Sequence, residues 1–432
     1  MLHNRTSQTA QSCEPILSLV NLRSKLPPKF QKYASLGVFP KILLAPVAFL
    51  ILTAFLLAKP FVQIRLYRMV DSRIGHLALN TERVRLSTLQ RNAQNSKREV
   101  LVYCSESKNC SNNALRKLFF RDSLHLRGHI AWLTLRMSSS IRFFNSFASI
   151  ANGDLIIDRD GLISSNLPEL TFTSQELNDG NDFLDQLKVD PQKFVCLHVR
   201  DSAYLTNIFG QQIHKHDYRD SEISTYVEAA EVLAEMGYTV FRMGALVKEP
   251  LVSKHPKIID YATNGMRTEF LDVFLGAHCT FCISTGSGWD GIPIIFRRPI
   301  LLVNHLPTFD TSTIPLPITI YPKILGNQRS LPSLSLTELI QREIATPHNS
   351  AAYADAGVEI RDLNSEELVE AVTEMAQRVE GTFVETPEQK EMQAKLRHIL
   401  STHPKLQPTP NYYPIRAQFA SCFLSRYPNF LD

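Results

Sequence analysis

The sequence predicts an α/β protein of two domains with parallel sheets, preceded by an apolar helix near the N-terminus. Three observations support this fold class. The chain has 432 residues, which is enough for two or three domains of ordinary size. Short apolar segments of strand length alternate with longer helical patterns, as they do where helices cover parallel sheets. Residues 42–58 form an uncharged apolar run between Lys41 and Lys59.

Composition and charge narrow the class of protein. Hydrophobic residues make up 44% of the chain and charged residues 20%, which excludes a disordered, collagen-like or coiled-coil protein. Residues 1–70 contain nine Lys and Arg against one Glu, whereas the rest of the chain has 37 basic and 41 acidic residues. The body of the protein is therefore mildly acidic, and we expect no nucleic-acid partner.

The apolar run is the first element in chain order. As a helix, Ile42 to Ala58 would be about 25 Å long, slightly short of a hydrocarbon core of about 30 Å. It favours a single membrane anchor; a helix lying on the membrane surface and an ordinary core helix are the alternatives. About forty residues precede it, which disfavours a cleaved signal peptide. We expect a membrane-associated protein whose catalytic body faces the cytoplasm, although basic residues on both flanks give no orientation.

The strand patterns that follow are short and mostly β-branched, as buried parallel strands are. They are expected at His76–Asn80, Val100–Tyr103, Leu155–Asp158, Phe194–Val199, Thr239–Met243, Lys257–Asp260, Thr280–Ser284, Ile300–Asn304 and Ile318–Tyr321. Helical patterns are expected at Asn113–Phe120, Ile130–Ile150, Asn181–Leu187, Ile223–Met236, Arg267–Ala277, Leu336–Ile344, Ser365–Val379 and Pro387–Leu400. The helix at Ser365 is supported by a capping residue ahead of acidic first-turn positions.

The domain boundaries follow from breaks in these patterns. The loosely patterned stretch 161–180 is the expected hinge between two sheets, and the proline-rich tract 307–332 marks a second boundary or a surface excursion. Helices after Leu363 have no expected strands between them. We therefore expect a basic N-terminal segment, two α/β domains facing one another across a ligand cleft, and a helical C-terminal region, at 1–70, 71–185, 186–345 and 346–432.

Seven cysteines are an odd and sparse set for this length, which argues against a disulfide framework and for a reducing compartment. Cys279 and Cys282 form a CxxC within an apolar run. Strand alternation would put their sulfur atoms on opposite faces, and no second CxxC completes a zinc site. We expect both to be buried core residues.

A small-residue turn is the first candidate for chemistry. Ser284, Thr285, Gly286, Ser287 and Gly288 connect an apolar strand to a helix that opens with Trp289, Asp290 and Gly291. Such a turn exposes backbone N–H groups that favour a phosphate. The turn is neither a Walker A loop nor the dinucleotide fingerprint. Its alternative role is to let the helix pack closely on the strand.

Charged residues follow two of the expected strands. His198, Arg200 and Asp201 come at the carboxyl end of the strand from Phe194, and Arg242 lies near the end of the strand from Thr239. Residues at that end of a parallel strand face the ligand crevice, and arginine binds a diphosphate with two parallel hydrogen bonds. Together with the small-residue turn they predict a diphosphate site. The alternative for Arg200 is an exposed side chain paired with Asp201.

Two further segments carry candidate site residues. His76 follows Gly75, where the backbone can approach a substrate, and a neutral histidine can accept a proton at physiological pH. His76 is therefore a candidate general base, or else a structural histidine. In the loop 211–220, Asp217, Arg219 or Asp220 could bind substrate hydroxyls.

Metal sites are the weaker alternatives for these polar segments. His214, His216 and Asp217 could ligate a metal ion, but no second cluster accompanies them, so a plain solvated loop is the other interpretation. Asp158 and Asp160, the only Asp-x-Asp pair, could hold a metal diphosphate. We expect neither and predict a site with no metal ion and no cofactor.

The chain resembles a family of bacterial glycosyltransferases that accompany surface-polysaccharide genes and have the two-Rossmann-domain (GT-B) architecture. The resemblance spans about residues 71–345. It is carried by RIGHLALNTE at 73, CLHVRDSAYL at 196, HDYRDSEISTYVEAAEVLAEMGYTVFRMG from 216 and EFLDVFLGAHCTFCISTGSGWDGIP from 269. More distantly, His198-x-Arg200 is similar to the His-x-Arg of GDP-fucose-dependent fucosyltransferases, whose arginine contacts the donor diphosphate. Arg73-Ile-Gly-His76 is similar to the Arg-x-Gly-Asp turn of heptosyltransferases, with His76 in place of the Asp proposed as base.

The resemblance implies a membrane-associated glycosyltransferase that moves a hexosyl or deoxyhexosyl group without a metal ion, in surface polysaccharide or glycoconjugate synthesis. Its substrates would be a nucleotide-sugar donor and a glycan or lipid-linked acceptor, with residues 71–185 binding the acceptor and 186–345 the donor. The donor site would comprise His198, Arg200, Arg242, Ser284, Thr285, Gly286, Ser287, Gly288 and Asp290; His76, Asp201 and Asp220 are the candidate catalytic residues. A non-catalytic nucleotide-sugar-binding or scaffold protein of the same fold and a metal-dependent hydrolase are the alternatives.

Overall fold

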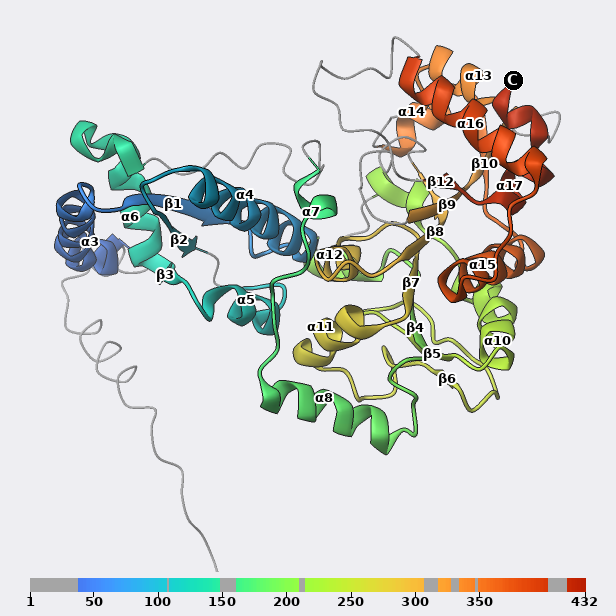
Figure 1. Ribbon diagram of the computed structural model, residues 1–432, viewed down its shortest axis with the longest axis horizontal. Coiled ribbons are helices and arrows are strands. Elements are labelled where there is room, and N and C mark those ends of the chain that lie inside the picture. The colour runs from blue at the N-terminus through green and yellow to red at the C-terminus, as the bar shows by residue number, and fades with distance from the viewer. Residues whose placement is uncertain are drawn as a thin grey trace, which may run out of the picture. The chain divides into compact units, whose positions relative to one another are not determined.

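The computed structural model describes residues 38–106, 109–147, 161–209, 214–306, 318–327, 334–345, 349–402 and 418–432 (Figure 1). These residues form an α/β protein, as expected, with three sheets in the described part of the chain. They group into two compact units made of interleaved segments. The first contains residues 38–68, 97–106 and 125–147, and the second the remainder. The four consecutive ranges expected from the sequence stay a prediction.

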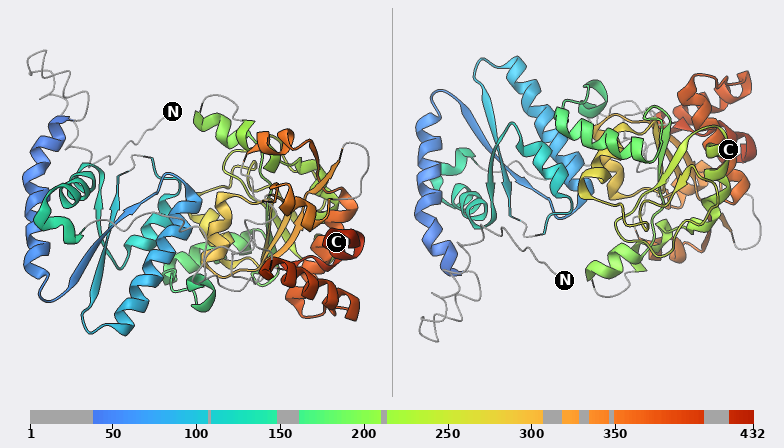
Figure 2. Two further views of the ribbon diagram at one scale, coloured as in Figure 1. Left: turned by 90° about the horizontal axis from the view of Figure 1, so that it is seen from above. Right: turned by 90° about the horizontal axis from the view of Figure 1, so that it is seen from below.

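The first unit is built on the sheet β1-β2-β3, formed by Gln63–Met69, Glu99–Ser105 and Leu124–Arg127. Two helices, α3 (Val38–Ala58) and α6 (Gly128–Ser140), pack on one another beside it. Figure 2 shows α3, in blue, lying alongside α6. Strand β2 confirms the expected strand at Val100–Tyr103. Strand β1 was not expected, because its basic residues Arg65 and Arg68 continue the basic flank of the apolar run.

The second unit contains a seven-stranded sheet in the order β12-β9-β8-β7-β4-β5-β6, and every neighbouring pair is parallel. Six of its strands confirm expected ones: β4 (Phe194–His198), β5 (Thr239–Arg242), β6 (Ile258–Ile259), β7 (Phe281–Ser284), β8 (Ile300–His305) and β9 (Ile318–Pro322). The chain runs outward from β4 to β6 and then from β7 to the other edge. The order therefore reverses between β4 and β7, and ligands of open parallel sheets bind at such a switch point.

The seventh strand, β12 (Gln418–Phe419), pairs with β9. It corrects the expectation that no strand follows Leu363, because a strand of two residues leaves no periodic pattern in a sequence. Two further strands, β10 (Ile324–Asn327) and β11 (Val358–Arg361), form a separate antiparallel pair. Both edge strands of the large sheet, β6 and β12, are thus two residues long.

Helices cover both faces of the large sheet. Figure 1 shows α11 and α12 on one side and α10 and α15 on the other. Helices at the expected places are α5 (Asn113–Phe120), α8 (Ser174–Gln186), α10 (Val227–Glu235), α11 (Glu269–His278), α13 (Leu336–Gln341), α15 (Ser365–Glu380) and α16 (Pro387–Thr402). The helix expected at Ile130–Ile150 is α6, which ends at Ser140. The short helix expected after the small-residue turn is α12 (Gly291–Ile295). Those not expected are α4 (Thr81–Gln94), α7 (Leu162–Ser165), α9 (Ala203–Phe209), α14 (Ser350–Asp355) and α17 (Ser421–Arg426). Thr173 begins α8 with a capping box, so the expected hinge 161–180 is partly helical.

The expected strand at His76–Asn80 is wrong, because these residues form a π-helical turn that continues into α4. Residues 77–80 are all buried, and a short apolar run buried on every side has the same appearance in a strand and in a helical turn. The expected strand at Leu155–Asp158 lies outside the described residues.

The cysteines of the large sheet are core residues, as expected. Cys196, Cys279 and Cys282 are free and buried, and burial raises the pKa of the Cys196 thiol. Cys196 and Cys282 are register partners on β4 and β7, whereas Cys279 caps α11 rather than lying in a strand.

Candidate active site

The candidate site lies at the switch point, where β4, β7 and β8 end. The Arg200 backbone N–H donates to Thr285 Oγ1 over 2.9 Å, and the Thr285 N–H donates to the His198 carbonyl over 3.3 Å. These bonds tie the chain beyond β4 to the turn beyond β7. The structure therefore brings His198, Arg200 and the turn from Ser284 to Gly288 to one edge of the sheet.

The turn is held by Asp290. Its carboxylate accepts the Ser284 hydroxyl over 2.6 Å, the Ser287 N–H over 2.7 Å and the Ser287 hydroxyl over 3.2 Å. The Gly286 N–H in turn donates to Ser284 Oγ over 3.1 Å. Burial raises the pKa of Asp290, and the hydrogen bonds from the two serines oppose that shift. Ser284, Ser287 and Asp290 thus shape the turn through contacts with one another.

Gly286 lies against two side chains that approach the turn from other elements. Its φ is +80°, in the left-handed region, and a Cβ atom there would lie 2.7 Å from His305 Nδ1 and 3.4 Å from Arg219 Nη2. Arg219 Nη2 also donates to the Gly286 carbonyl. A side chain at this position would collide with the His305 ring, so glycine is required for space as well as for backbone conformation.

His305 is the residue of this site that sequence reasoning missed. It is 4% exposed, and neither ring nitrogen has a hydrogen-bond partner. Burial lowers its pKa to about 3, and Arg219 adds to the shift, so the imidazole is neutral. A neutral imidazole has one N–H donor and one acceptor, and leaving both unsatisfied in the interior is costly. A ligand that offered complementary groups would remove that cost.

A bulge in β8 directs His305 into the site. The register between β8 and β9 shifts between Val303 and His305, and Asn304 has a φ of +50°. The Asn304 side chain donates to the Tyr226 hydroxyl over 2.8 Å and accepts the Leu363 N–H over 2.7 Å, which holds the bulge in place. Bulges often redirect a side chain next to a functional site. The sequence signal that could have pointed to His305 was an asparagine followed by a histidine at the end of an apolar strand.

Two arginines, Arg200 and Arg219, bring positive charge to the site. Arg200 Nε lies 3.1 Å from Asp220 Oδ1, and 15% of the Arg200 side chain is exposed. Burial lowers the pKa of Arg200, and the neighbouring charge of Arg219 lowers it further. Burial raises the pKa of Asp220, and Arg200 opposes that shift. Neighbouring guanidinium groups repel one another, so an anion between them is favoured.

His198 is stacked on Trp289, with ring centroids 5.6 Å apart and 9° between the planes. Burial lowers the pKa of His198 to about 4, and the charge of Arg242 contributes, so this ring is also neutral. Its Nδ1 atom is buried without a partner. The site therefore contains two neutral imidazoles with unsatisfied nitrogen atoms.

Arg242 and Asp201 have structural partners. Arg242 is 1% exposed, lies 3.4 Å from Asp260 Oδ1 and donates to the Glu249 carbonyl over 3.0 Å. Asp201 accepts the N–H groups of Ala203 and Lys248 on its two carboxylate oxygens, over 2.9 and 2.8 Å. Both side chains hold loops at this edge of the sheet, and the Arg242 guanidinium is not exposed there.

The segment before His76 packs on the same turn. A Cβ atom on Gly75 would lie 3.0 Å from Gly288 Cα, and one on Gly288 would lie 3.2 Å from the Gly75 nitrogen. His76 is half-buried, and its Nδ1 lies 3.3 Å from the Asn80 amide nitrogen. Burial lowers the pKa of His76, and Arg73 lowers it further. The close approach of two glycines thus brings a neutral histidine next to the turn at Gly288.

The metal-ligand candidates fall largely outside what the structure describes: Asp158 and Asp160 lie in an undescribed segment, and the side chains of His214 and His216 are not described. Among the described residues, no group of three His, Cys, Asp or Glu could hold a metal ion.

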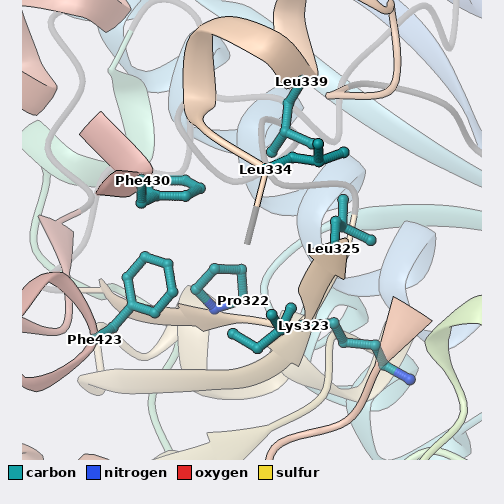
Figure 3. A pocket seen from close by; sticks show the side chains of 8 residues that line it. Pro322, Lys323, Leu325, Leu334, Leu339, Phe423 and Phe430 are labelled. Carbon is teal, nitrogen blue, oxygen red and sulfur yellow. The ribbon is translucent and has the colours of Figure 1, made fainter. Parts of the chain in front are cut away.

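One pocket lies away from these residues (Figure 3). It is lined by Pro322, Lys323, Ile324, Leu325, Leu334, Leu339, Phe423 and Phe430. In Figure 3 the Lys323 amine points away from the two phenylalanines. It donates instead to the Asp220 carbonyl over 2.7 Å and lies 2.6 Å from Asp362. Most of the side chains that line the pocket are apolar, and none of the candidate site residues is among them.

No protein-family model and no curated protein matches the chain. Several solved structures are similar to it. E. coli ADP-heptose lipopolysaccharide heptosyltransferase II is 12% identical, covers 60% of this chain and 90% of its own, and has a TM-score of 0.37. A family 9 glycosyl transferase from Veillonella parvula is 11% identical, covers 61% of this chain and 86% of its own, and has a TM-score of 0.36. E. coli heptosyltransferase WaaC with ADP-2-deoxy-2-fluoro heptose is 12% identical, covers 56% of this chain and 88% of its own, and has a TM-score of 0.27. These TM-scores are too low to support an argument about the fold, so the fold assignment rests on the strand order of the chain itself.

Proposed function

We propose that this protein is a glycosyltransferase of the GT-B type. It transfers a hexosyl or deoxyhexosyl group from a nucleoside-diphosphate sugar to a hydroxyl of a glycan or lipid-linked acceptor, in surface polysaccharide or glycoconjugate synthesis. The observation that carries the proposal is the grouping of two arginines and an unpartnered neutral histidine around Gly286, at the switch point of a parallel sheet. Arginines and polar groups at such a point suit a phosphorylated ligand.

The donor diphosphate binds beside the turn from Ser284 to Gly288. Arg200 and Arg219 supply positive charge, and the repulsion between them is relieved when a phosphate lies against both. His305 supplies an N–H donor or an acceptor lone pair to the donor. Arg242 acts indirectly, by holding the chain beyond β5 through Asp260.

His76 is the general base of the proposed reaction. It is neutral, and it lies next to the glycine contact with the donor turn. Asp201 accepts backbone N–H groups on both oxygens, and Asp220 is paired with Arg200, so each carboxylate already has a partner. The His76 imidazole takes the proton of the acceptor hydroxyl as its oxygen bonds to the anomeric carbon and the nucleoside diphosphate leaves. The arginines stabilise the charge on the leaving group without a metal ion.

The test is a thermal-shift panel of GDP-, UDP- and ADP-linked sugars, followed by titration calorimetry with the donor that stabilises the protein. Loss of one charge-assisted arginine contact costs about 2–3 kcal/mol, so Arg200→Ala should weaken donor binding about 30- to 150-fold. The control is Arg342→Ala, which removes a surface arginine paired with Glu338 and should leave binding unchanged. Unchanged donor binding and turnover in Arg200→Ala would refute the site. Donor binding with neither hydrolysis nor transfer would favour the non-catalytic alternative.

A further inference from the structure

From Ile42 to Ala58, helix α3 is apolar around its whole circumference, but the protein covers only one of its faces. Ala48 and Leu52 on that face are fully buried, and Phe55 packs edge-to-face on Phe147 with ring centroids 6.2 Å apart. Leu52 belongs to the core that contains Leu66 of β1. The covered face of α3 is therefore part of the core of the first unit, shared with its sheet.

The opposite face forms an exposed stripe. It comprises Ile42, Leu43, Val47, Leu50 and Leu57, which are 44–73% exposed. Leu43, Leu50 and Leu57 are seven residues apart and lie on one side of the helix. The one hydroxyl in the helix, on Thr53, donates to the Phe49 carbonyl over 2.9 Å. The stripe is thus a continuous apolar surface of the kind that marks an interaction site.

The charge of the first unit indicates what covers the stripe. Its described residues include nine Lys and Arg against two Glu, a net charge of +7. Both glutamates are already paired, Glu99 with Arg65 over 3.0 Å and Glu106 with Arg68 over 2.7 Å. Lys41 and Lys59 lie at the two ends of the helix, Lys41 on the same face as the buried Ala48, with its amine 4.1 Å from the centroid of the Trp132 ring. An exposed apolar surface on a unit of net positive charge fits a bilayer with anionic headgroups.

By length and composition, residues 41–58 could cross a membrane. The packing of α3 argues against that arrangement. Helix α6 lies along α3 and carries the exposed Arg136, and the sheet shares the α3 core. A spanning α3 would place this helix and its charged residue in hydrocarbon, which is costly. A helix lying flat exposes only the stripe to lipid.

We propose that α3 lies in the plane of an anionic membrane surface. The exposed stripe enters the boundary between headgroups and acyl chains, and the positive charge of the first unit attracts the anionic headgroups. This inference is independent of the proposed transferase activity, because it uses no residue of the candidate active site.

Vesicle flotation of the purified full chain tests the surface. The chain should float with phosphatidylcholine vesicles containing about 30% phosphatidylglycerol and bind pure phosphatidylcholine more weakly, with binding falling as salt rises. The double variant Leu43→Glu/Leu50→Glu should bind at least about tenfold more weakly. The control is Leu167→Glu, at an 83% exposed leucine of the second unit, and it should bind like the wild type.

Two flotation results would overturn the proposal: wild-type binding by the double variant, or no binding by the wild type. A lipid-free dimer that the double variant dissociates, with no vesicle binding by either, would show that a second copy covers the stripe instead. Unchanged melting temperatures of both variants, as expected at exposed positions, would show that the fold is retained.

Depth measurement separates a flat helix from a spanning one. A fluorescent amino acid placed in turn at positions 43, 50 and 57 is quenched by lipids with spin labels at different depths. A flat helix gives the same shallow depth at all three positions. A spanning helix gives the greatest depth at position 50 and shallow depths at the other two, and that result would refute the in-plane arrangement.

Discussion

Replacement of Gly286 by alanine is the sharpest test of the site geometry. Gly286 has a φ of +80°, and a Cβ atom would lie 2.7 Å from His305 Nδ1. The left-handed conformation costs about 1–2 kcal/mol in alanine, and the stiffer unfolded chain recovers about 0.4–1 kcal/mol of that. Collision with a buried ring adds about 1–3 kcal/mol. We therefore expect Gly286→Ala to lower the free energy of unfolding by about 1–5 kcal/mol.

The matched control is Gly381→Ala. Gly381 has a φ of +73° but no atom within 4 Å of its Cβ position, so it carries the backbone cost without the collision. Equilibrium urea unfolding followed by circular dichroism should show a loss larger by about 1–3 kcal/mol in Gly286→Ala than in the control. In the His305→Ala variant the ring is gone, so adding Gly286→Ala to it should lower the free energy of unfolding by no more than Gly381→Ala does in the wild type. Equal losses at the two glycines would refute the packing of His305 against the turn.

Three further predictions follow from the buried polar groups. Arg242→Met leaves the Asp260 carboxylate without its cation and should lower the free energy of unfolding by about 3 kcal/mol; an unchanged urea midpoint would contradict a structural role. Because the His305 pKa falls from 6.5 to about 3 on folding, the unfolded chain takes up the proton between these values, and stability is lost as the pH falls through that window. His305→Gln should therefore lose about 2 kcal/mol less than the wild type between pH 7 and pH 5, and parallel pH profiles would argue against a buried neutral ring. Asp290→Asn removes one acceptor from the turn and should cost about 1–3 kcal/mol and weaken donor binding; a variant with wild-type stability would show that the carboxylate does not hold the turn.

Much of the large sheet could be predicted from the sequence. Segments such as Phe194–His198 are short apolar runs buried on both faces, and this property is local. The rule that ligands bind beyond the carboxyl ends of parallel strands then placed Arg200 and the small-residue turn at one edge. The π-helical turn His76–Asn80 could not be predicted. The backbone of Gly75, the residue before this turn, is packed against that of Gly288, more than two hundred residues away in the chain.

The hydrogen-bond and ion-pair partners of the site residues also could not be predicted from the sequence. Arg242 could be placed at a strand end, but its pairing with Asp260 depends on a neighbouring strand. His305 enters the site only because a bulge at Asn304 turns the end of β8, and that bulge is held by hydrogen bonds to distant residues. A residue's place along a strand is thus a local property, whereas the direction of its side chain depends on tertiary contacts.

The two-residue edge strands of the large sheet have a consequence for solubility. A long open edge offers unpaired backbone groups to another chain, and pairing of this kind starts aggregation. Strand β9, Ile318–Pro322, is buried and largely β-branched, and β12 covers the middle of its outer edge by pairing with Thr319 and Ile320. Because β12 itself is so short, it leaves little edge for intermolecular pairing. A chain shortened before Gln418 would expose the full length of β9 and should precipitate where the intact protein stays dispersed.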